Sequence, residues 1–455
     1  MPVKPDIQKL SASSPEILNV IRANASPTYQ ERVPLADGST ASIREIGNII
    51  MQYVPLQNEF LNALVNRIGR VIITSKLYEN PWAFEKKGML EFGETVEEIF
   101  VNIAKPHQFN PEVAETNVFK REIPDVRAAF HTMNYQKYYK STVSNDQLRQ
   151  AFLSWNGITD LIARIVDAMY TGANYDEFLT MKYLIFKMAN NGNIYSEGIP
   201  AITADSAKGI VTTIKGISNT LEFMSTAYNM NGVQTFTLKE DQFILLNAKF
   251  DATIDVEVLA SAFNMDKAEF MGRRVLVDSF GNLDVARLDE LFADDPTYVS
   301  PTSEQLNAMD NVAAVIIDRD WFMVFDNFYN FTEQYNGEGL YWNYWYHVWK
   351  TFSASPFANA ILFTTDTPAV TSVTVSPATA TVAKGASQQL NAAVVTTGFA
   401  PKTVTWSLTG ATSSTISANG LLSVGADETG TSITVTATST FDTSKTGTST
   451  ITVQA

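Results

Sequence analysis

The sequence GLYWNYWYHVWKTFSASPFANAILF, residues 339–363, ends a stretch of the chain that is rich in aromatic side chains. Within it, residues 341–349 carry Tyr, Trp, His and Val on both alternating faces. A strand of this kind has to be covered on both faces by other parts of the protein. We therefore expect residues 341–349 to form a strand that is packed on both sides.

The composition changes abruptly after this stretch. Residues 366–455 are rich in Thr, Ser, Val, Ala and Gly, and their only aromatic residues are Phe399, Trp406 and Phe441. Apolar and polar residues alternate there in short segments separated by Gly and Ser, which is typical of a small β-sandwich. The strand candidates are residues 373–377, 389–395, 404–408, 421–424, 433–437 and 449–453. We thus predict a body over residues 1–365 and an all-β domain over residues 366–455, whose core Trp406 anchors.

The overall composition excludes several classes of protein. The chain has 455 residues, of which 45% are hydrophobic and 18% charged, enough for sizeable folded cores. Its net charge of −15 argues against nucleic-acid binding through a basic surface. Without cysteine it has no disulfide, thiol nucleophile or thiolate metal site. The first 14 residues lack the apolar segment of a secretory signal and no run is long enough to span a membrane, so we expect synthesis and folding in the cytoplasm.

Local patterns divide the body further. Residues 1–40 are predicted to form an irregular arm with a short helix near residues 15–23, and Ile43, Ile46 and Ile50 share one face of a further helix. Residues about 75–140 are charged and interrupted by Pro and Gly, which predicts a long β-hairpin or extended excursion. Apolar residues at helical spacing predict a long helix over residues 146–170, capped by Ser144 or Asn145 and broken at residues 171–174, and a second helix over 176–192. Residues 200–350 alternate helices, within 206–230 and 255–263, with strands at 242–246, 275–278 and 313–317.

Residues that could carry chemistry are scattered along the chain. His107, His131 and His347 do not have the spacing of a metal site, and we interpret His107 as a solvated loop residue and His347 as a core residue. Asp318 and Asp320 follow an apolar strand, a position where enzymes place catalytic acids, but a strand-ending turn with a local ion pair is the favoured interpretation. No phosphate-binding, dinucleotide-binding or nucleophile-elbow motif is present. We therefore predict no catalytic, cofactor or metal site, and a protein that is not an enzyme.

Several stretches of the body resemble one protein family. FILLNAKFDATIDVEVLASAFNMDKAEFMG (243–272), DRDWFMVFDN (318–327), AFLSWNGI (151–158), GETVEEIF (93–100) and the residues at 339–363 are similar, in the same order, to the major capsid proteins of phi-twenty-nine-type tailed phages. The later segments VTVSP (373–377), VTWSL (404–408), GLLSV (420–424) and ITVTATS (433–439) resemble a bacterial immunoglobulin-like domain of group 2.

The resemblance implies an α+β fold of the Hong Kong 97 capsid type, followed by the small immunoglobulin-like sandwich. It assigns an N-terminal arm to residues 1–50, an extended loop to about 75–140, a spine helix to about 146–191, and axial and peripheral regions to about 195–365. The extended loop of this family reaches over a neighbouring subunit, which makes Lys86, Lys87, Glu91 and Glu94 candidate subunit contacts.

The implied function is that of a structural major capsid protein of a tailed phage with double-stranded DNA, located in the virion and made in the cytoplasm of a bacterial host. The expected partners are further copies in hexamers and pentamers, a scaffolding protein, the portal, and enclosed DNA that is not bound sequence-specifically. The immunoglobulin-like domain is expected outside the shell, where it contacts neighbouring capsomers or bacterial surfaces. The alternatives are an encapsulin-like compartment shell protein and, less favoured, a bacterial surface adhesin.

Overall fold

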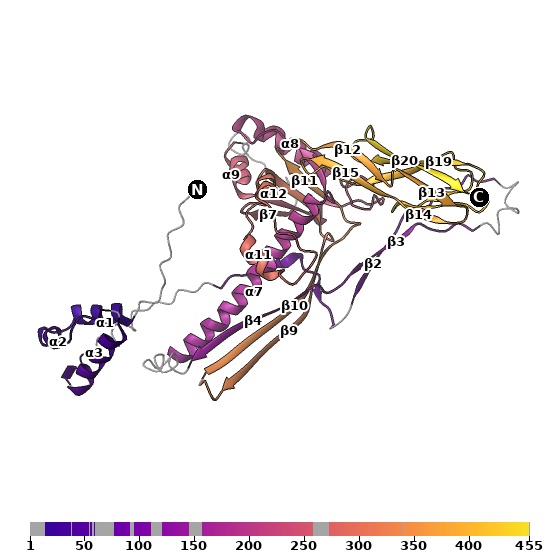
Figure 1. The fold of residues 1–455 in the computed structure, drawn as a ribbon. Helices are drawn as coiled ribbons and strands as arrows, with labels where there is room; N and C mark the ends of the chain where they lie inside the picture. Colours follow the sequence, from indigo (N-terminus) through magenta and orange to yellow (C-terminus); the bar gives the residue numbers. More distant parts are fainter. Residues whose placement is uncertain are drawn as a thin grey trace. The chain divides into compact units, whose positions relative to one another are not determined.

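The computed structural model describes residues 14–37, 39–53, 55–56, 59, 77–91, 95–110, 121–144, 157–257, 273–339 and 341–454. These residues fall into two compact units (Figure 1). The first takes the described parts of residues 1–77, 143–168 and 336–342, and the second takes those of 78–142, 169–335 and 343–455. The sequence also predicts a helix that begins at Pro55, has Phe60, Leu64 and Ile68 on one face and ends at Gly69, followed by a strand at residues 71–74. Residues 55, 56 and 59 are helical, and the rest of this prediction lies outside the described residues.

The first unit contains three short N-terminal helices, α1 (Ser14–Ala23), α2 (Pro27–Arg32) and α3 (Thr40–Gln52). The side chains of Ser26 and Ser39 accept backbone N–H groups at the starts of α2 and α3, satisfying donors that have no partner within the helix. The helices bury a small core that includes Ile21, Tyr29 and Ile46. Helix α1 and the helical face at Ile46, within α3, were predicted, whereas α2, which begins at Pro27 in a position that suits the first turn of a helix, was not.

A five-stranded sheet forms the centre of the second unit, in the order β5-β11-β8-β6-β7. Its middle strands are almost completely buried, as expected for apolar strands covered on both faces. Helices α8 and α9 pack on one face, where Ile210, Ile214 and Phe250 meet Ile244 and Phe363. The strands are β5 (Tyr195–Gly198), β6 (Gln242–Asn247), β7 (Arg273–Val277), β8 (Val312–Asp318) and β11 (Ala360–Thr364). The helices of this region are α8 (Ala204–Thr220), α9 (Ala248–Glu257), α11 (Val285–Leu291) and α12 (Ser303–Asp310).

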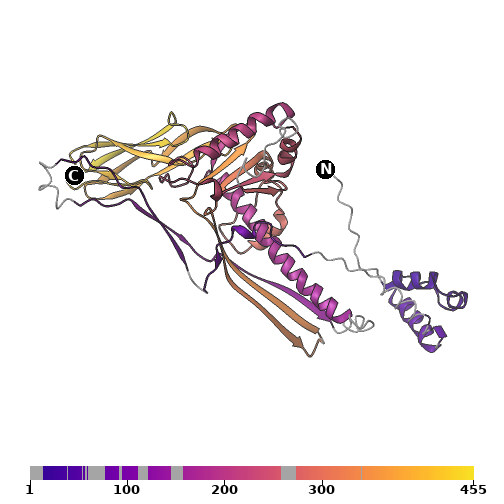
Figure 2. The ribbon, with the colours of Figure 1, turned by 180° about the vertical axis from the view of Figure 1, so that it is seen from behind.

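A second sheet has the order β1-β9-β10-β4. It contains the predicted aromatic strand as β10 (Tyr341–Ala354), beside β1 (Gly88–Met89), β9 (Phe322–Asn336) and β4 (Tyr135–Ser144). Helix α7 (Gly157–Asn190) runs along this sheet, where the rings of Tyr170 and Tyr346 lie 4.5 Å apart (Figures 1 and 2). The face of β10 with Tyr344, Tyr346 and Val348 is buried, whereas Trp345, His347 and Trp349 on the opposite face are only half-buried, so the subunit does not cover both faces as predicted.

The structure contradicts one prediction about the long helix, its break, and leaves another, its N-terminal cap, untested. The predicted break at residues 171–174 is absent, because α7 continues through them to Asn190 as one helix of 34 residues. Gly172 lies inside the helix without ending it, and a Cβ there would lie 3.5 Å from the ring of Tyr139, an ordinary van der Waals distance. The predicted cap at Ser144 or Asn145 is not tested, because residues 145–156 lie outside the described part of the chain; Ser144 is the last residue of strand β4.

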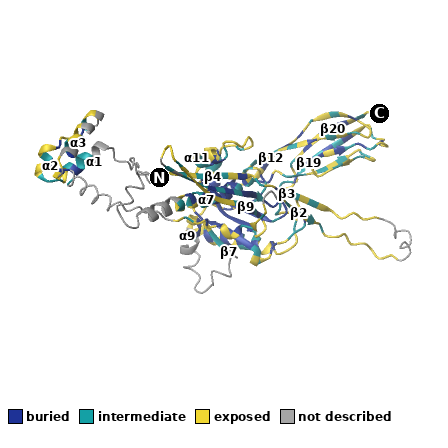
Figure 3. Cartoon of the chain, turned by 90° about the horizontal axis from the view of Figure 1, so that it is seen from below, coloured by how far each residue is buried: buried dark blue, intermediate teal, exposed yellow. Residues whose placement is uncertain are grey.

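The predicted excursion contains an antiparallel hairpin of β2 (Val96–Val101) and β3 (Val126–His131). Figure 3 shows that the hairpin and the segments beyond it are exposed along most of their length. The predicted helix at residues 255–263 begins earlier, as α9, and its part beyond Glu257 lies outside the described residues.

Residues 369–454 form the C-terminal sandwich, drawn in yellow and light orange in Figure 2. Its sheets are β12-β15, β13-β20-β19-β16 and β14-β18-β17. All the predicted strands are present, and the short strands β13, β14 and β17 were not predicted. The strands are β12 (Ala369–Ser376), β13 (Thr379–Ala383), β14 (Ser387–Gln389), β15 (Asn391–Thr397), β16 (Val404–Thr409), β17 (Thr415–Ile416), β18 (Leu421–Ser423), β19 (Ser432–Ser439) and β20 (Thr446–Gln454).

Candidate functional site

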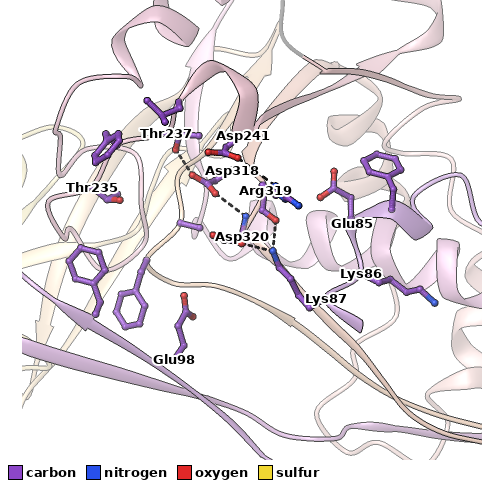
Figure 4. A pocket seen from close by; sticks show the side chains of 16 residues that line it. Glu85, Lys86, Lys87, Glu98, Thr235, Thr237, Asp241, Asp318, Arg319 and Asp320 are labelled. Carbon is purple, nitrogen blue, oxygen red and sulfur yellow. Dashed lines mark hydrogen bonds and ion pairs between the residues drawn. The ribbon is translucent and has the colours of Figure 1, made fainter. Parts of the chain in front are cut away.

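A hollow of about 680 Å³ is lined by strand β2 of the hairpin, by the segment that precedes β1 and by the end of strand β8 (Figure 4). Aromatic side chains, including Phe84 and Phe236, line it together with the carboxylates of Asp241, Asp318 and Asp320. Among the described residues no group of three or more His, Asp or Glu side chains is arranged to hold a metal ion. The hollow therefore has the acidic residues that the sequence singled out, without a metal-binding arrangement.

Asp318 and Asp320 are both engaged in local structure. Thr237 donates its hydroxyl to Asp318 Oδ2 at 2.5 Å, and the Asp320 backbone N–H donates to Asp318 Oδ1 at 2.8 Å. Burial raises the pKa of Asp318 above its ordinary value, despite these hydrogen bonds. Asp320 pairs with Lys87 Nζ at 2.5 Å, and the same amine donates to the carbonyl of Arg319. The strand-ending turn is therefore confirmed, whereas the ion pair is not local, because Lys87 lies 233 positions from Asp320 along the chain.

The predicted subunit-contact residues have different surroundings. Lys87 makes the contacts just described, and Lys86 points into the subunit, where it pairs with Asp326 at 2.9 Å and Glu177 at 3.3 Å. Glu91 is exposed, and Glu94 lies outside the described residues. The structure therefore brings Lys86 and Lys87 to the root of the hairpin, where both contact their own subunit, and their contact with a neighbour stays a prediction.

Lys86 belongs to a buried charge cluster that consists of Lys86, Glu177, Asp326 and Lys350. Lys350, on β10, contacts Glu177 Oε2 and lies 3.2 Å from Asp326 Oδ1, with only 4% of its side chain exposed. Burial, together with the neighbouring charge of Lys86, lowers the pKa of Lys350 to about 6. Sequence analysis missed this cluster because its members come from four distant segments. The one available signal was a lysine at the end of a strand that is apolar on both faces.

The outer face of the hairpin is apolar and exposed. It consists of Ile99, Val101, Val126, Ala128 and Phe130, which pair across the two strands or alternate along them, and of one charged residue, Glu97, which lies opposite Phe130. Between 51% and 65% of each of its large side chains, Ile99, Val101, Val126 and Phe130, is accessible. Contiguous apolar surface of this kind marks interaction sites on soluble proteins.

The three histidines have different surroundings. His131 is buried between Ser353 Oγ, 2.8 Å from Nδ1, and Glu98 Oε2, 3.1 Å from Nε2, so it joins the hairpin to β10. His107 is exposed and lies 2.9 Å from Glu122, as expected for a solvated loop residue. His347 is half-buried beside the ring of Tyr138, so its placement in the core was wrong.

In the C-terminal sandwich, Trp406 lies on β16 and packs against the buried core while remaining partly exposed. The fully buried side chains of this core are aliphatic, such as Leu390, Leu422 and Ile433. Trp406 also covers Gly420, where a Cβ would lie 2.9 Å from its ring. Its role as the anchor of the core stays a prediction.

The sandwich contacts the body through a small polar seat. The Lys402 backbone N–H donates to the Gly192 carbonyl at 3.2 Å, its Nζ donates to the Asn190 carbonyl at 2.8 Å, and Ser196 donates to the Gly398 carbonyl at 2.6 Å. Gly192 has φ +73°, and a Cβ there would lie 2.7 Å from Lys402 Cγ. The turn after α7 therefore needs a glycine at position 192, because a larger residue there would collide with Lys402.

Comparison with known proteins shows the family to which the chain belongs. The family model of the Phi29-like phage major capsid protein matches residues 18–364. The chain belongs to this family. The model of the bacterial Ig-like domain (group 2) matches residues 369–451. No helix among the described residues is both long and apolar enough to cross a membrane.

Relatives and solved structures agree with this assignment. The major capsid protein of Bacillus phage B103 is 39% identical over 430 residues, which cover 91% of this chain and 87% of the relative. That of Bacillus phage PZA is 36% identical over 425 residues, covering 91% of this chain and 87% of the relative. The capsid structure of Staphylococcus phage Andhra matches with a TM-score of 0.52 and 17% identity, over 65% of this chain and 86% of that one.

These findings confirm the family, the Hong Kong 97-like capsid fold of the body and the immunoglobulin-like C-terminal domain. The protein is a phage major capsid protein, which places it in the shell of the virion and requires it to associate with itself. The match to phage proteins favours this function over an encapsulin-like compartment or a surface adhesin.

Proposed function

We propose that this capsid protein assembles into hexamers and pentamers of a closed head shell around double-stranded DNA, and that the hairpin of each subunit lies on a neighbouring subunit. The observation that carries this proposal is the apolar outer face of the hairpin, which nothing in the described part of its own chain covers. Burying such side chains against a second copy supplies the free energy of association.

In this shell, each part of the chain has its own structural role. Residues 1–50 serve as the N-terminal arm, about 75–140 as the extended loop, about 146–191 as the spine helix, and about 195–365 as the axial and peripheral regions. Lys86, Lys87, Glu91 and Glu94 lie at the start of the extended loop, where the first two also bind their own subunit. Residues 366–455 form a separate domain on the outside of the shell.

Replacement of two residues of the outer face, Ile99→Asp with Phe130→Asp, tests the hairpin contact. Both side chains are largely exposed in the subunit, so the variant should fold, while assembly should be lost because charges would enter an apolar contact. Val395→Asp is the matched control, since Val395 is 55% exposed on a strand of the C-terminal domain. Negative-stain microscopy of each variant, expressed with a scaffolding protein, measures the yield of shells. Equal shell yields from the double variant and the control would refute the hairpin contact.

The further partners belong to the same proposal. A scaffolding protein directs assembly, the portal occupies one vertex, and DNA is enclosed without sequence-specific contacts, consistent with a net charge of −15 that keeps DNA from adhering to the wall. The protein is made in the cytoplasm of the host and has no enzymatic activity. DNA inside particles purified from infected cells supports the phage shell, whereas particles filled with an enzyme would indicate the compartment alternative.

A further inference from the structure

Lys350 lies where an amine and a carboxyl group are held together away from water. Its Nζ contacts Glu177 Oε2 and is 3.2 Å from Asp326 Oδ1. The exposed fractions of the side chains are 4% for Lys350, 2% for Glu177 and 15% for Asp326. Asp326 is on β9 and Lys350 on β10, which are neighbouring strands of one sheet.

The surroundings of the two groups differ in a way that suits a reaction. Oδ1 of Asp326, which faces Lys350, receives no hydrogen bond of good geometry from the described residues. Oδ2 of the same carboxyl is bound by Lys86 Nζ at 2.9 Å. Glu177 is held in place by Asn80, whose Nδ2 donates to Oε1 at 2.5 Å, while Oε2 faces the amine of Lys350.

We propose that Lys350 Nζ and Cγ of Asp326 condense into an intramolecular amide bond, with Glu177 carrying the proton. The inference rests on these contacts and does not depend on the proposed hairpin contact.

The step balances as a simple condensation. A proton passes from the ammonium of Lys350 to the carboxylate of Asp326, leaving an uncharged amine and a carboxylic acid. The nitrogen lone pair attacks Cγ, and Lys86 stabilises the negative charge that develops on Oδ2. Glu177 takes one proton from the nitrogen and delivers it to the Oδ1 hydroxyl, the C–O bond breaks, and one water molecule leaves.

Three physical factors favour this reaction over a permanent ion pair. Burial favours the uncharged amine, as the pKa of Lys350 near 6 indicates. Groups held at contact distance react with effective concentrations of roughly 10⁵–10⁸ M in well-oriented cases. Condensation also removes one positive and one negative charge from a buried place, and the remaining pair, Lys86 and Glu177, stays balanced at 3.3 Å.

The product would be a covalent tie between β9 and β10 beneath helix α7. Both strands form the sheet that carries β1, the strand at the root of the hairpin. The tie would prevent the two strands from separating when the subunit is heated or strained.

Mass spectrometry of the denatured full-length chain tests the proposal without any substitution. The expected mass is lower than that of the sequence by one water molecule, and proteolysis should yield a branched peptide that joins the segment of Lys350 to that of Asp326. An unreduced mass, or a branch that maps to Glu177 or to any other residue, would overturn the proposal.

Two variants control for other losses of water, such as ring closure at Asp37–Gly38. Lys350→Met has no amine and should show the full mass expected from its sequence. Glu177→Gln keeps the shape of the side chain but cannot take the proton, so the branched peptide should form at least about tenfold more slowly after synthesis. A water loss that persists in Lys350→Met, or an unchanged rate in Glu177→Gln, would contradict the assigned chemistry.

Discussion

Replacement of Trp82 by Ala should destabilise the body of the capsid subunit strongly. Trp82 is fully buried between the segment that leads to the hairpin, helix α7 and strand β9. Its ring lies 5.0 Å from that of Phe178 in an edge-to-face arrangement and 6.0 Å from that of Phe322. Trp82 therefore packs the root of the hairpin against α7 and β9, which carry Glu177 and Asp326, two of the four residues of the buried charge cluster.

The expected magnitude follows from this burial. A buried Trp replaced by Ala typically costs about 3–5 kcal/mol of the free energy of unfolding. Trp82→Phe keeps an aromatic ring and removes roughly two carbon atoms, which at about 0.8 kcal/mol each predict a loss of at most about 1.6 kcal/mol, because the third atom removed, Nε1, is buried without a hydrogen-bond partner among the described residues. A double-mutant cycle of Trp82→Ala with Phe178→Leu should assign about 0.5–1.5 kcal/mol of the loss in Trp82→Ala to the edge-to-face pair of the two rings.

Urea denaturation of unassembled subunits measures these losses. The helical circular dichroism signal reports on the body, because the described part of the C-terminal domain contains strands and no helix. Met89→Ala serves as the control and should cost less than about 0.5 kcal/mol, since Met89 is 69% exposed. A loss below about 1 kcal/mol for Trp82→Ala would refute the inferred packing at the root of the hairpin.

Three further predictions concern the C-terminal domain. Gly420→Ala should lower its stability more than Gly385→Ala, because both glycines have φ +78° but a Cβ at Gly420 would lie 2.4 Å from the Leu390 carbonyl oxygen, whereas Gly385 faces open space. Thermal unfolding measures the difference, and equal losses would contradict the close approach. Hydrogen bonds from Ser414, Thr412 and Gly430 hold the pKa of Glu428 below its ordinary value of 4.5. The stability that Glu428 contributes is therefore present above that pH and is lost as the pH falls through its folded-state pKa. Glu428→Gln should weaken hydrogen-exchange protection around Glu428 at neutral pH and reduce its dependence on acid, and unchanged protection would count against this role. Truncation after Thr365 should leave a folded body that still assembles, because the body has a buried core of its own and the sandwich contacts it through hydrogen bonds around Lys402 and a ring contact between Phe441 and Tyr195. Loss of the helical signal on truncation would show that the body depends on the domain.

The C-terminal domain could be predicted well from the sequence. Its alternating segments have period two and are separated by Gly and Ser, so each strand is specified by a few adjacent residues. The strands that were missed, β13, β14 and β17, have between two and five residues and offer too little alternation. The aromatic strand β10 was recognised for a related reason, since its two apolar faces are visible locally.

The course of α7 was predicted less well. Thr171, Gly172 and Asn174 have unfavourable local preferences for a helix, and these predict a break. The helix continues because tertiary contacts compensate. Asn174 donates its side-chain amide to the Tyr78 carbonyl at 3.0 Å, and Asp176 is paired with Arg287.

The sequence by itself determined the family, the two-part organisation and most of the strands, because these depend on ordered motifs and on patterns of adjacent residues. Only the tertiary structure decided that Lys86 points inward and that Lys350, Glu177 and Asp326 meet in one buried cluster. It also decided which face of the hairpin is exposed. Contacts between residues that are distant along the chain, such as Lys86 and Asp326 at 240 positions apart, depend on how sheets and helices pack, and no local pattern in the chain records that packing.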